Sequence, residues 1–137
     1  MQDIRAFLEQ LDQWLAQESA ISAVLLVGSH ARGAARADSD IDLVLMADDP
    51  TVYLQDPRWL TVFGQVNRAE VEDWGMVQSI RVFYADGLEV EFGLTTSQWA
   101  AVDPVDAGTE GVVRDGARIL LDRPGQLAAL LAAVSGQ

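Results

Sequence analysis

The chain has 137 residues, the size of one domain, and half of them are hydrophobic, so a folded core is expected rather than disorder. Acidic residues outnumber basic ones by 21 to nine, and the net charge of −12 disfavours broad binding to nucleic acid. The absence of cysteine excludes disulfides and thiolate chemistry. Without a signal-peptide pattern or an apolar run near the roughly 18 residues of a membrane span, a soluble cytoplasmic protein is expected.

The first third of the chain predicts one helix and two buried strands. Apolar residues recur at helical spacing over residues 4–15, and polar residues occupy the opposite side. The continuous apolar runs at 22–27 and 41–46 predict strands in the centre of a sheet. Between them, Ser29 is expected to cap a short helix that ends near Gly33.

The middle of the chain predicts a short helix and a hairpin. Residues 57–64 favour a helix between a capping Asp56 and the glycine at 64, and 67–74 is a weaker strand candidate. Residues 76–85 alternate acceptably for a strand, and the Asp-Gly pair that follows is a strong hairpin signal. The return strand, 88–92, alternates strictly between apolar residues and glutamates.

The last third predicts smaller elements. A short helix begins at Thr96 or Ser97, and residues 108–116 are rich in turn formers. Residues 118–121 predict a last strand, and a final amphipathic helix is expected to begin at Asp122, with proline in its first turn.

A Gly-Ser pair follows the first apolar run. Gly28 has no Cβ, so a phosphate can approach its backbone closely. Ser29 adds a hydroxyl beside the N–H groups expected at a helix start, which favour anions. Alone, such a pair is more often structural.

Ten residues after Ser29, the second apolar run opens with two carboxylates. Asp40 and Asp42 point to the same side of a strand, about 6.6 Å apart along it. Two carboxylates on an apolar strand are costly unless a cation sits between them, and Mg²⁺ is the natural candidate because it prefers oxygen ligands. A solvent-facing strand end is the alternative.

Glu89 and Glu91 form a second same-face pair on the hairpin strand. If that strand lies beside Asp40 and Asp42, one of the two glutamates completes a cluster of three carboxylates. Three carboxylates can hold two Mg²⁺ ions for in-line displacement at phosphorus. The alternative is that the two glutamates are the wet face of an amphipathic hairpin.

The pattern Gly28-Ser29, ten residues, Asp40-x-Asp42 resembles the signature of the DNA polymerase β-like nucleotidyltransferases. The stretches 29–33 and 39–43 are typical of the minimal nucleotidyltransferases, and 59–91 is similar to aminoglycoside 6-adenylyltransferases. This resemblance implies an α+β fold, with a mixed β-sheet flanked by helices as in the polymerase β palm. It also implies one nucleotidyltransferase domain over residues 1–137.

The resemblance implies a role for each matching residue. Gly28 and Ser29 would hold the triphosphate of ATP, and Asp40 and Asp42 would bind Mg²⁺. Glu91, favoured over Glu89, would be the third metal ligand and act as base or orient the acceptor hydroxyl. These residues would transfer AMP from ATP to a hydroxyl.

The resemblance also bears on partners. Aminoglycoside adenylyltransferases carry an additional helical domain with no counterpart in this sequence, so the acceptor surface is expected from a partner, a second copy of the chain or a macromolecular acceptor. Minimal nucleotidyltransferases often act as antitoxins beside a helical HEPN-type toxin and adenylylate it. The alternatives are a small acceptor of the aminoglycoside type and a nucleotide-binding module without catalysis.

Other polar and aromatic residues have weaker assignments. Arg32 and Arg36 lie between the two apolar runs and could contact phosphates, since the chain has no lysine; a solvated role is an equal alternative. Glu70, Glu72 and Asp73 are expected to face solvent on their strand. The four tryptophans are expected in the core rather than against a ligand.

Overall fold

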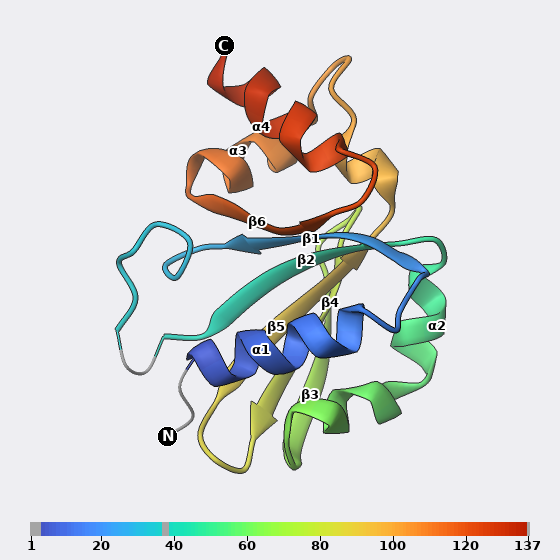
Figure 1. The fold of residues 1–137 in the computed structure, drawn as a ribbon, viewed down its shortest axis with the longest axis vertical. Helices are drawn as coiled ribbons and strands as arrows, with labels where there is room; N and C mark the ends of the chain where they lie inside the picture. The colour runs from blue at the N-terminus through green and yellow to red at the C-terminus, as the bar shows by residue number, and fades with distance from the viewer. Residues whose placement is uncertain (1–3, 37–38, 137) are drawn as a thin grey trace.

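A computed structural model of the chain describes residues 4–36 and 39–136 and contains one six-stranded sheet with helices on both faces (Figure 1). The α-helices are α1 (Ile4–Leu15), α2 (Pro50–Gln55), α3 (Ala107–Arg114) and α4 (Gln126–Ser135). The 3₁₀ helices are η1 (Pro57–Phe63) and η2 (Ser97–Ala100). The strands are β1 (Ile21–Val27), β2 (Ile41–Ala47), β3 (Val66–Asp73), β4 (Gln78–Tyr84), β5 (Glu89–Thr95) and β6 (Ala117–Asp122).

The sheet is mixed, with strand order β3-β4-β5-β2-β1-β6. Strands β2 and β5 run parallel, and the other neighbouring pairs are antiparallel. The two predicted central strands, β1 and β2, are buried on both faces, as their continuous apolar sequences indicate. The α+β class with a mixed sheet flanked by helices is therefore confirmed.

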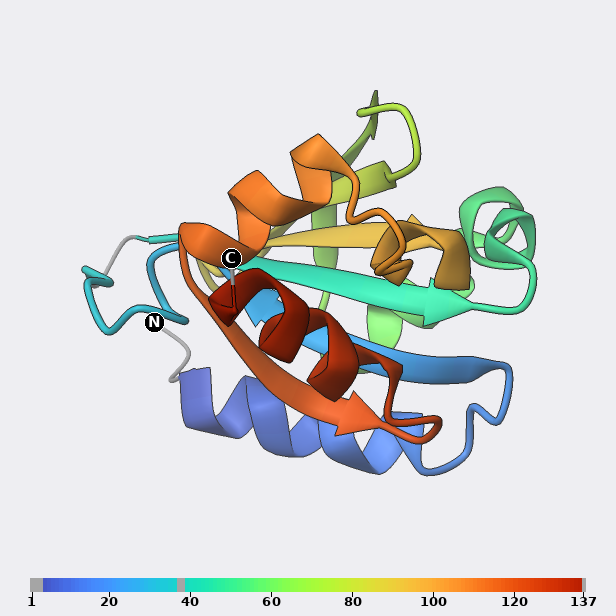
Figure 2. The ribbon, with the colours of Figure 1, turned by 90° about the horizontal axis from the view of Figure 1, so that it is seen from above.

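Each face of the sheet has its own apolar core. Helices α1, α2 and η1 cover one face, and α3, α4 and η2 cover the other (Figure 2). Strand β2 contributes to both cores by alternation: Ile41, Leu43 and Leu45 pack beneath α1, whereas Val44 and Met46 face α4 and η2. Asp42 belongs to this second set by its position in the strand, so its carboxylate faces the α3 side.

Two local predictions were wrong, and one helix was not predicted. The segment that begins at Ser29 is a series of turns, because Gly33 adopts a positive φ of 72° and the Ala34 N–H bonds to the Ser29 carbonyl. The supposed turn-rich stretch 108–116 is largely helix α3, whose start is capped by Asp106 through the Thr109 N–H. Helix α2, which Asp49 caps, was not predicted.

The last helix was predicted, but it begins four residues later than expected. Asp122 is the last residue of β6, and its side chain accepts hydrogen bonds from the backbone N–H groups of Leu127 and Ala128. It therefore caps the start of α4, although Gly125 occupies the N-cap position. Across residues 4–36 and 39–136, the helices are all too short or too polar to cross a bilayer.

Candidate active site

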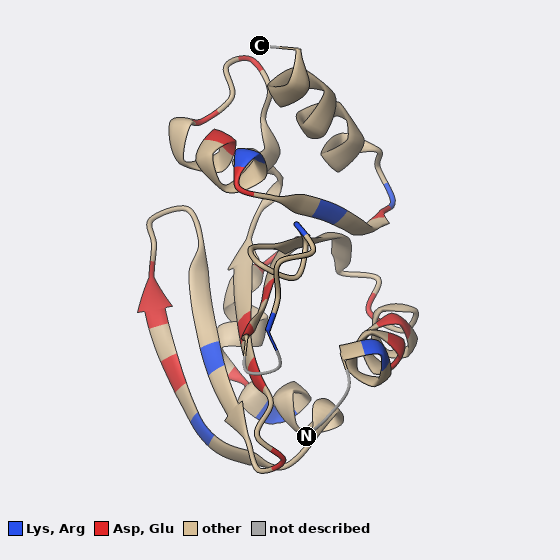
Figure 3. Ribbon diagram, turned by 90° about the vertical axis from the view of Figure 1, so that its left-hand side faces the viewer, with Lys and Arg blue, Asp and Glu red and all other residues tan. Residues whose placement is uncertain are grey.

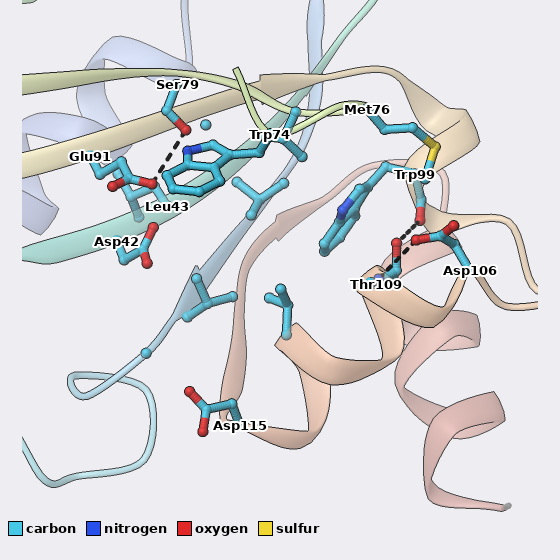
Figure 4. A pocket seen from close by; sticks show the side chains of 17 residues that line it. Asp42, Leu43, Trp74, Met76, Ser79, Glu91, Trp99, Asp106, Thr109 and Asp115 are labelled. Carbon is cyan, nitrogen blue, oxygen red and sulfur yellow. Dashed lines mark hydrogen bonds between the residues drawn. The ribbon is translucent and has the colours of Figure 1, made fainter. Parts of the chain in front are cut away.

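Two carboxylates meet where the parallel strands run side by side. Asp42 on β2 is the register partner of Glu91 on β5, so both side chains point to the same face of the sheet. The hydroxyl of Ser79, on β4, donates to Glu91 Oε2 at 3.3 Å (Figure 4). Asp40 lies just before β2 and is drawn toward this group by Arg81.

Asp42 occupies an unfavourable position for a negative charge. Burial, followed by the charges of Glu91 and Asp40, raises its pKa from 3.8 to about 7, and Arg81 offsets this only in part. Its side chain has no hydrogen-bond partner among the residues that the structure describes. A proton or an added cation would relieve this repulsion.

Glu91 differs from Asp42 because it has a counter-ion. Burial raises the pKa of Glu91, whereas the nearby guanidinium of Arg81 lowers it. Arg81 forms ion pairs with Glu91, Glu89, Glu72 and Asp40, so one guanidinium serves four carboxylates. Glu72 is therefore half-buried in an ion pair rather than simply solvated as expected.

The Gly-Ser turn lies directly against these carboxylates. Gly28 ends β1 with a φ of 77°, and a Cβ built on it would lie 3.7 Å from the Cβ of Asp42. The Gly28 carbonyl accepts the N–H groups of Ala31 and Arg32, which closes a turn and not a helix. A phosphate can still approach the backbone at Gly28 closely, as predicted. The predicted contribution of a helix N-terminus at Ser29 is lost, because no helix begins there.

Arg32 lies at the same turn, with its side chain turned toward the end of α3. Its guanidinium donates to the backbone carbonyl of Asp115 at 3.2 Å and to Asp115 Oδ2 at 3.3 Å. Both side chains are largely exposed, so this ion pair is a weak tie. Arg36 is exposed and makes its described contact through the backbone, to Ser39 Oγ.

A pocket of about 500 Å³ opens between this face of the sheet and α3. Figure 4 shows Asp42, Glu91 and Trp74 at one end and Met76, Trp99 and Asp106 at the other. The lining residues include the carboxylates of Asp42, Glu91, Asp106 and Asp115, and they include no lysine or arginine. Glu91 is part of this wall and Glu89 is not.

The donor set suits a divalent cation in chemistry, but the carboxylates are not gathered around one point. Among residues 4–36 and 39–136, no three Asp, Glu or His side chains are close enough to hold a metal ion together. Asp42 faces the pocket unpaired, whereas Asp40 and Glu91 are both engaged by Arg81. The carboxylate oxygens of Asp40, Asp42 and Glu91 are the type of ligand that Mg²⁺ prefers. A cation beside Asp42 would also offset the burial and the neighbouring negative charges that raise its pKa.

Comparison with known proteins identifies the family. The sequence model of the streptomycin adenylyltransferase family matches residues 1–133. This chain belongs to that family. Membership confirms the resemblance to nucleotidyltransferases that the sequence motifs indicate. No curated protein sequence matches the chain.

Solved structures agree with the family assignment at the level of the fold. An aminoglycoside 6-adenyltransferase from Bacillus subtilis superposes with a TM-score of 0.59 at 15% identity, over 73% of this chain and 37% of that enzyme. The chain therefore spans little more than a third of that enzyme's length. A structure described as a toxin–antitoxin with AMP-PNP superposes with a TM-score of 0.51 at 13% identity, over 94% of this chain and 84% of the other.

The pocket of this chain also contains residues that the sequence analysis did not identify as site residues. Trp74 was expected in the core, but its side chain is 61% exposed at the β3–β4 turn and lines the pocket. Gly75, which follows Trp74, adopts a positive φ in this turn. A tryptophan directly before a turn glycine has little core to enter, so the Trp-Gly pair in the sequence could have identified Trp74 as exposed. Asp106 and Asp115, at the two ends of α3, were missed because the helix itself was missed.

Proposed function

We propose that the chain transfers AMP from ATP to an acceptor hydroxyl in a Mg²⁺-dependent reaction. The observation that carries the proposal is the Asp42–Glu91 pair, which lies across two parallel strands at one end of a pocket and beside Gly28. Two desolvated carboxylates with raised pKa values are the kind of group that a metal-assisted active site contains.

The roles of the residues follow from the chemistry of the transfer. The acceptor oxygen bonds to the α-phosphorus, the bond to the β-phosphate breaks, and pyrophosphate leaves with the electron pair. Glu91 accepts the proton of the acceptor hydroxyl or orients that group, and Gly28 and Ser29 let the triphosphate approach the β1 end. Two Mg²⁺ ions held by Asp40, Asp42 and Glu91 would activate the hydroxyl and neutralise the leaving group.

We propose a partner protein of the HEPN type as the acceptor. The structure described as a toxin–antitoxin with AMP-PNP supports this proposal, because the similarity extends over 84% of that chain and 94% of this one. The nucleotide in that description also supports ATP as the donor.

A cationic small molecule of the aminoglycoside type is the second candidate acceptor. It is favoured by the charge of the pocket, whose lining contains four carboxylates and no basic side chain. Such a wall attracts a polyamine and repels a second anion.

The test is transfer of label from α-³²P-ATP in the presence of Mg²⁺. The acceptors are the protein encoded by the neighbouring gene and a panel of aminoglycosides, and Asp40→Asn and Asp42→Asn are the inactive controls. Labelled partner protein supports the first acceptor, and labelled antibiotic the second. The catalytic proposal is wrong if neither acceptor is labelled and if ATP with Mg²⁺ raises the melting temperature of the unchanged chain no more than that of the variant that carries both Asp40→Asn and Asp42→Asn. A complex with the partner that survives both substitutions would then indicate a binding module.

A further inference from the structure

Arg81 is the cation around which the carboxylates of this face are arranged. It lies on β4 directly opposite Glu91 of β5, and its side chain is 24% exposed. In the hairpin of β3 and β4, the acidic positions lie on β3, and each strand carries one arginine (Figure 3). Among the described ion pairs of the chain, those of Arg81 reach the metal ligands proposed above, Asp40 and Glu91.

The partners divide between different nitrogens of the guanidinium. Nε donates to Glu72 Oε1 at 2.9 Å, and Nη1 donates to Glu89 Oε2 at 2.7 Å. Nη2 pairs with Glu91, and Nη1 makes a longer contact of 3.3 Å to Asp40. A guanidinium has five N–H donors in a rigid fork, so it can keep some partners while it releases others.

Of the four described partners of Arg81, Glu91 alone lies in the pocket wall. Glu72 and Glu89 are outside the pocket wall, whereas Glu91 is part of it beside Asp42. A cation that binds Asp42 and Glu91 must take over the charge that Arg81 neutralises. Glu72 and Glu89 can retain the guanidinium when this happens, because their bonds use Nε and Nη1.

We propose that Arg81 is a positioning residue that competes with the divalent cation: it holds Glu91 and Asp40 when no metal is bound and is retained by Glu72 and Glu89 when the metal takes these carboxylates. The inference rests on the proposed function only in its choice of Asp40, Asp42 and Glu91 as metal ligands. Metal binding then includes the cost of breaking two charge-assisted hydrogen bonds, the one to Glu91 and the longer one to Asp40.

The test measures binding of Mn²⁺ alone, by the electron paramagnetic resonance signal of the free ion, with Mg²⁺ as competitor. Arg81→Gln should bind Mn²⁺ roughly 3- to 10-fold more tightly than the unchanged chain, because the competing ion pair is gone. Arg68→Gln is the matched control: Arg68 lies on the neighbouring strand β3, pairs with Glu70 and contacts none of the proposed metal ligands. Its Mn²⁺ affinity should stay within twofold.

A second pair of variants predicts a change of opposite sign. Glu72→Gln removes a retaining partner, so Arg81 should bind Glu91 more firmly and Mn²⁺ affinity should fall further than in Glu70→Gln, a variant with the same charge change on the same strand. If Arg81→Gln does not fold, the comparison of Glu72→Gln with Glu70→Gln still tests whether Arg81 competes with the cation. Equal Mn²⁺ affinities within each pair, or absence of Mn²⁺ binding in every variant, would overturn the proposal. Mn²⁺ binding needs no acceptor, so a negative transfer assay does not affect this result.

Discussion

Asp42 lies directly opposite Glu91 in the parallel β2–β5 pair, and both side chains line the pocket. Their positions in the sequence are far apart, and the strand register brings them together. Arg81 neutralises Glu91, whereas Asp42 has no such partner among the described residues. In the metal-free chain, the charge on Asp42 is therefore a cost to folding that a proton can remove.

Replacing Asp42 by asparagine should stabilise the metal-free protein at alkaline pH. The folded chain holds the Asp42 proton up to about pH 7, whereas the unfolded chain releases it near pH 3.8. Between these values the folded state binds more protons, so the free energy of unfolding falls as pH rises. The loss is at most roughly 4 kcal/mol and is complete above about pH 7. Asp42→Asn should not show it.

The measurement is urea unfolding in EDTA at pH 5 and at pH 8. Asp12→Asn is the control, because Asp12 is exposed on α1 and should leave the pH dependence unchanged. If Asp42→Asn loses as much stability between the two pH values as the unchanged chain, the carboxylate is not strained.

Gly93→Ala should destabilise the sheet beside the pocket. A Cβ at Gly93 would lie 2.9 Å from the carbonyl oxygen of Leu43 and 2.9 Å from a methyl group of Val77. The carbonyl is part of the β2–β5 ladder and cannot move freely, so we expect a loss of about 1–3 kcal/mol by thermal or urea unfolding. The matched control is Gly111→Ala in α3, where a Cβ meets nothing within 4 Å. This change should stabilise by about 0.5–1 kcal/mol, and a loss at both positions would contradict the packing argument.

The sequence predicted the sheet better than the loops, for physical reasons. Buried strands such as β1 and β2 leave long apolar runs, and the strict alternation of β5 marks its two faces. The turn after Gly28 was predicted as a helix because serine at a helix start and serine in a turn look alike. Helix α3 was missed because its two glycines suggest turns, and the capping by Asp106 is visible only once the helix is known.

The candidate site was predicted in part. The sequence predicted a cluster of Asp40, Asp42 and one hairpin glutamate, and the parallel register places Asp42 beside Glu91. The described carboxylates nevertheless do not gather around one point. Arg81 was not predicted as part of the group, because its four ion pairs come from β3, β5 and the residue before β2. Such a contact depends on strand order, which no local pattern encodes.

Arg32→Ala should weaken the use of ATP with little effect on folding. The Arg32–Asp115 pair is exposed, so its loss should cost less than about 1 kcal/mol of unfolding free energy. If Arg32 turns to the triphosphate, the KM for ATP should rise about tenfold, while kcat changes less. Asp115→Ala separates the two roles, because it removes the side-chain acceptor and leaves the arginine in place, held only by the backbone carbonyl of residue 115. An equal rise in KM in both variants would mean that Arg32 only fixes the turn.

Trp74→Ala should reduce nucleotide affinity without unfolding the protein. The indole is 61% exposed and lies beside Glu91 at the pocket end (Figure 4), so its removal should change stability by less than about 1 kcal/mol. Stacking of a base on an aromatic ring contributes about 1–3 kcal/mol, so AMP-PNP should bind roughly 5- to 100-fold more weakly by calorimetry. Trp74→Phe keeps a ring and should restore most of the affinity. Trp99→Ala, at a residue 3% exposed in the second core, should instead cost about 3–5 kcal/mol of stability. Unchanged AMP-PNP binding in Trp74→Ala would assign this wall of the pocket to the acceptor rather than to the nucleotide.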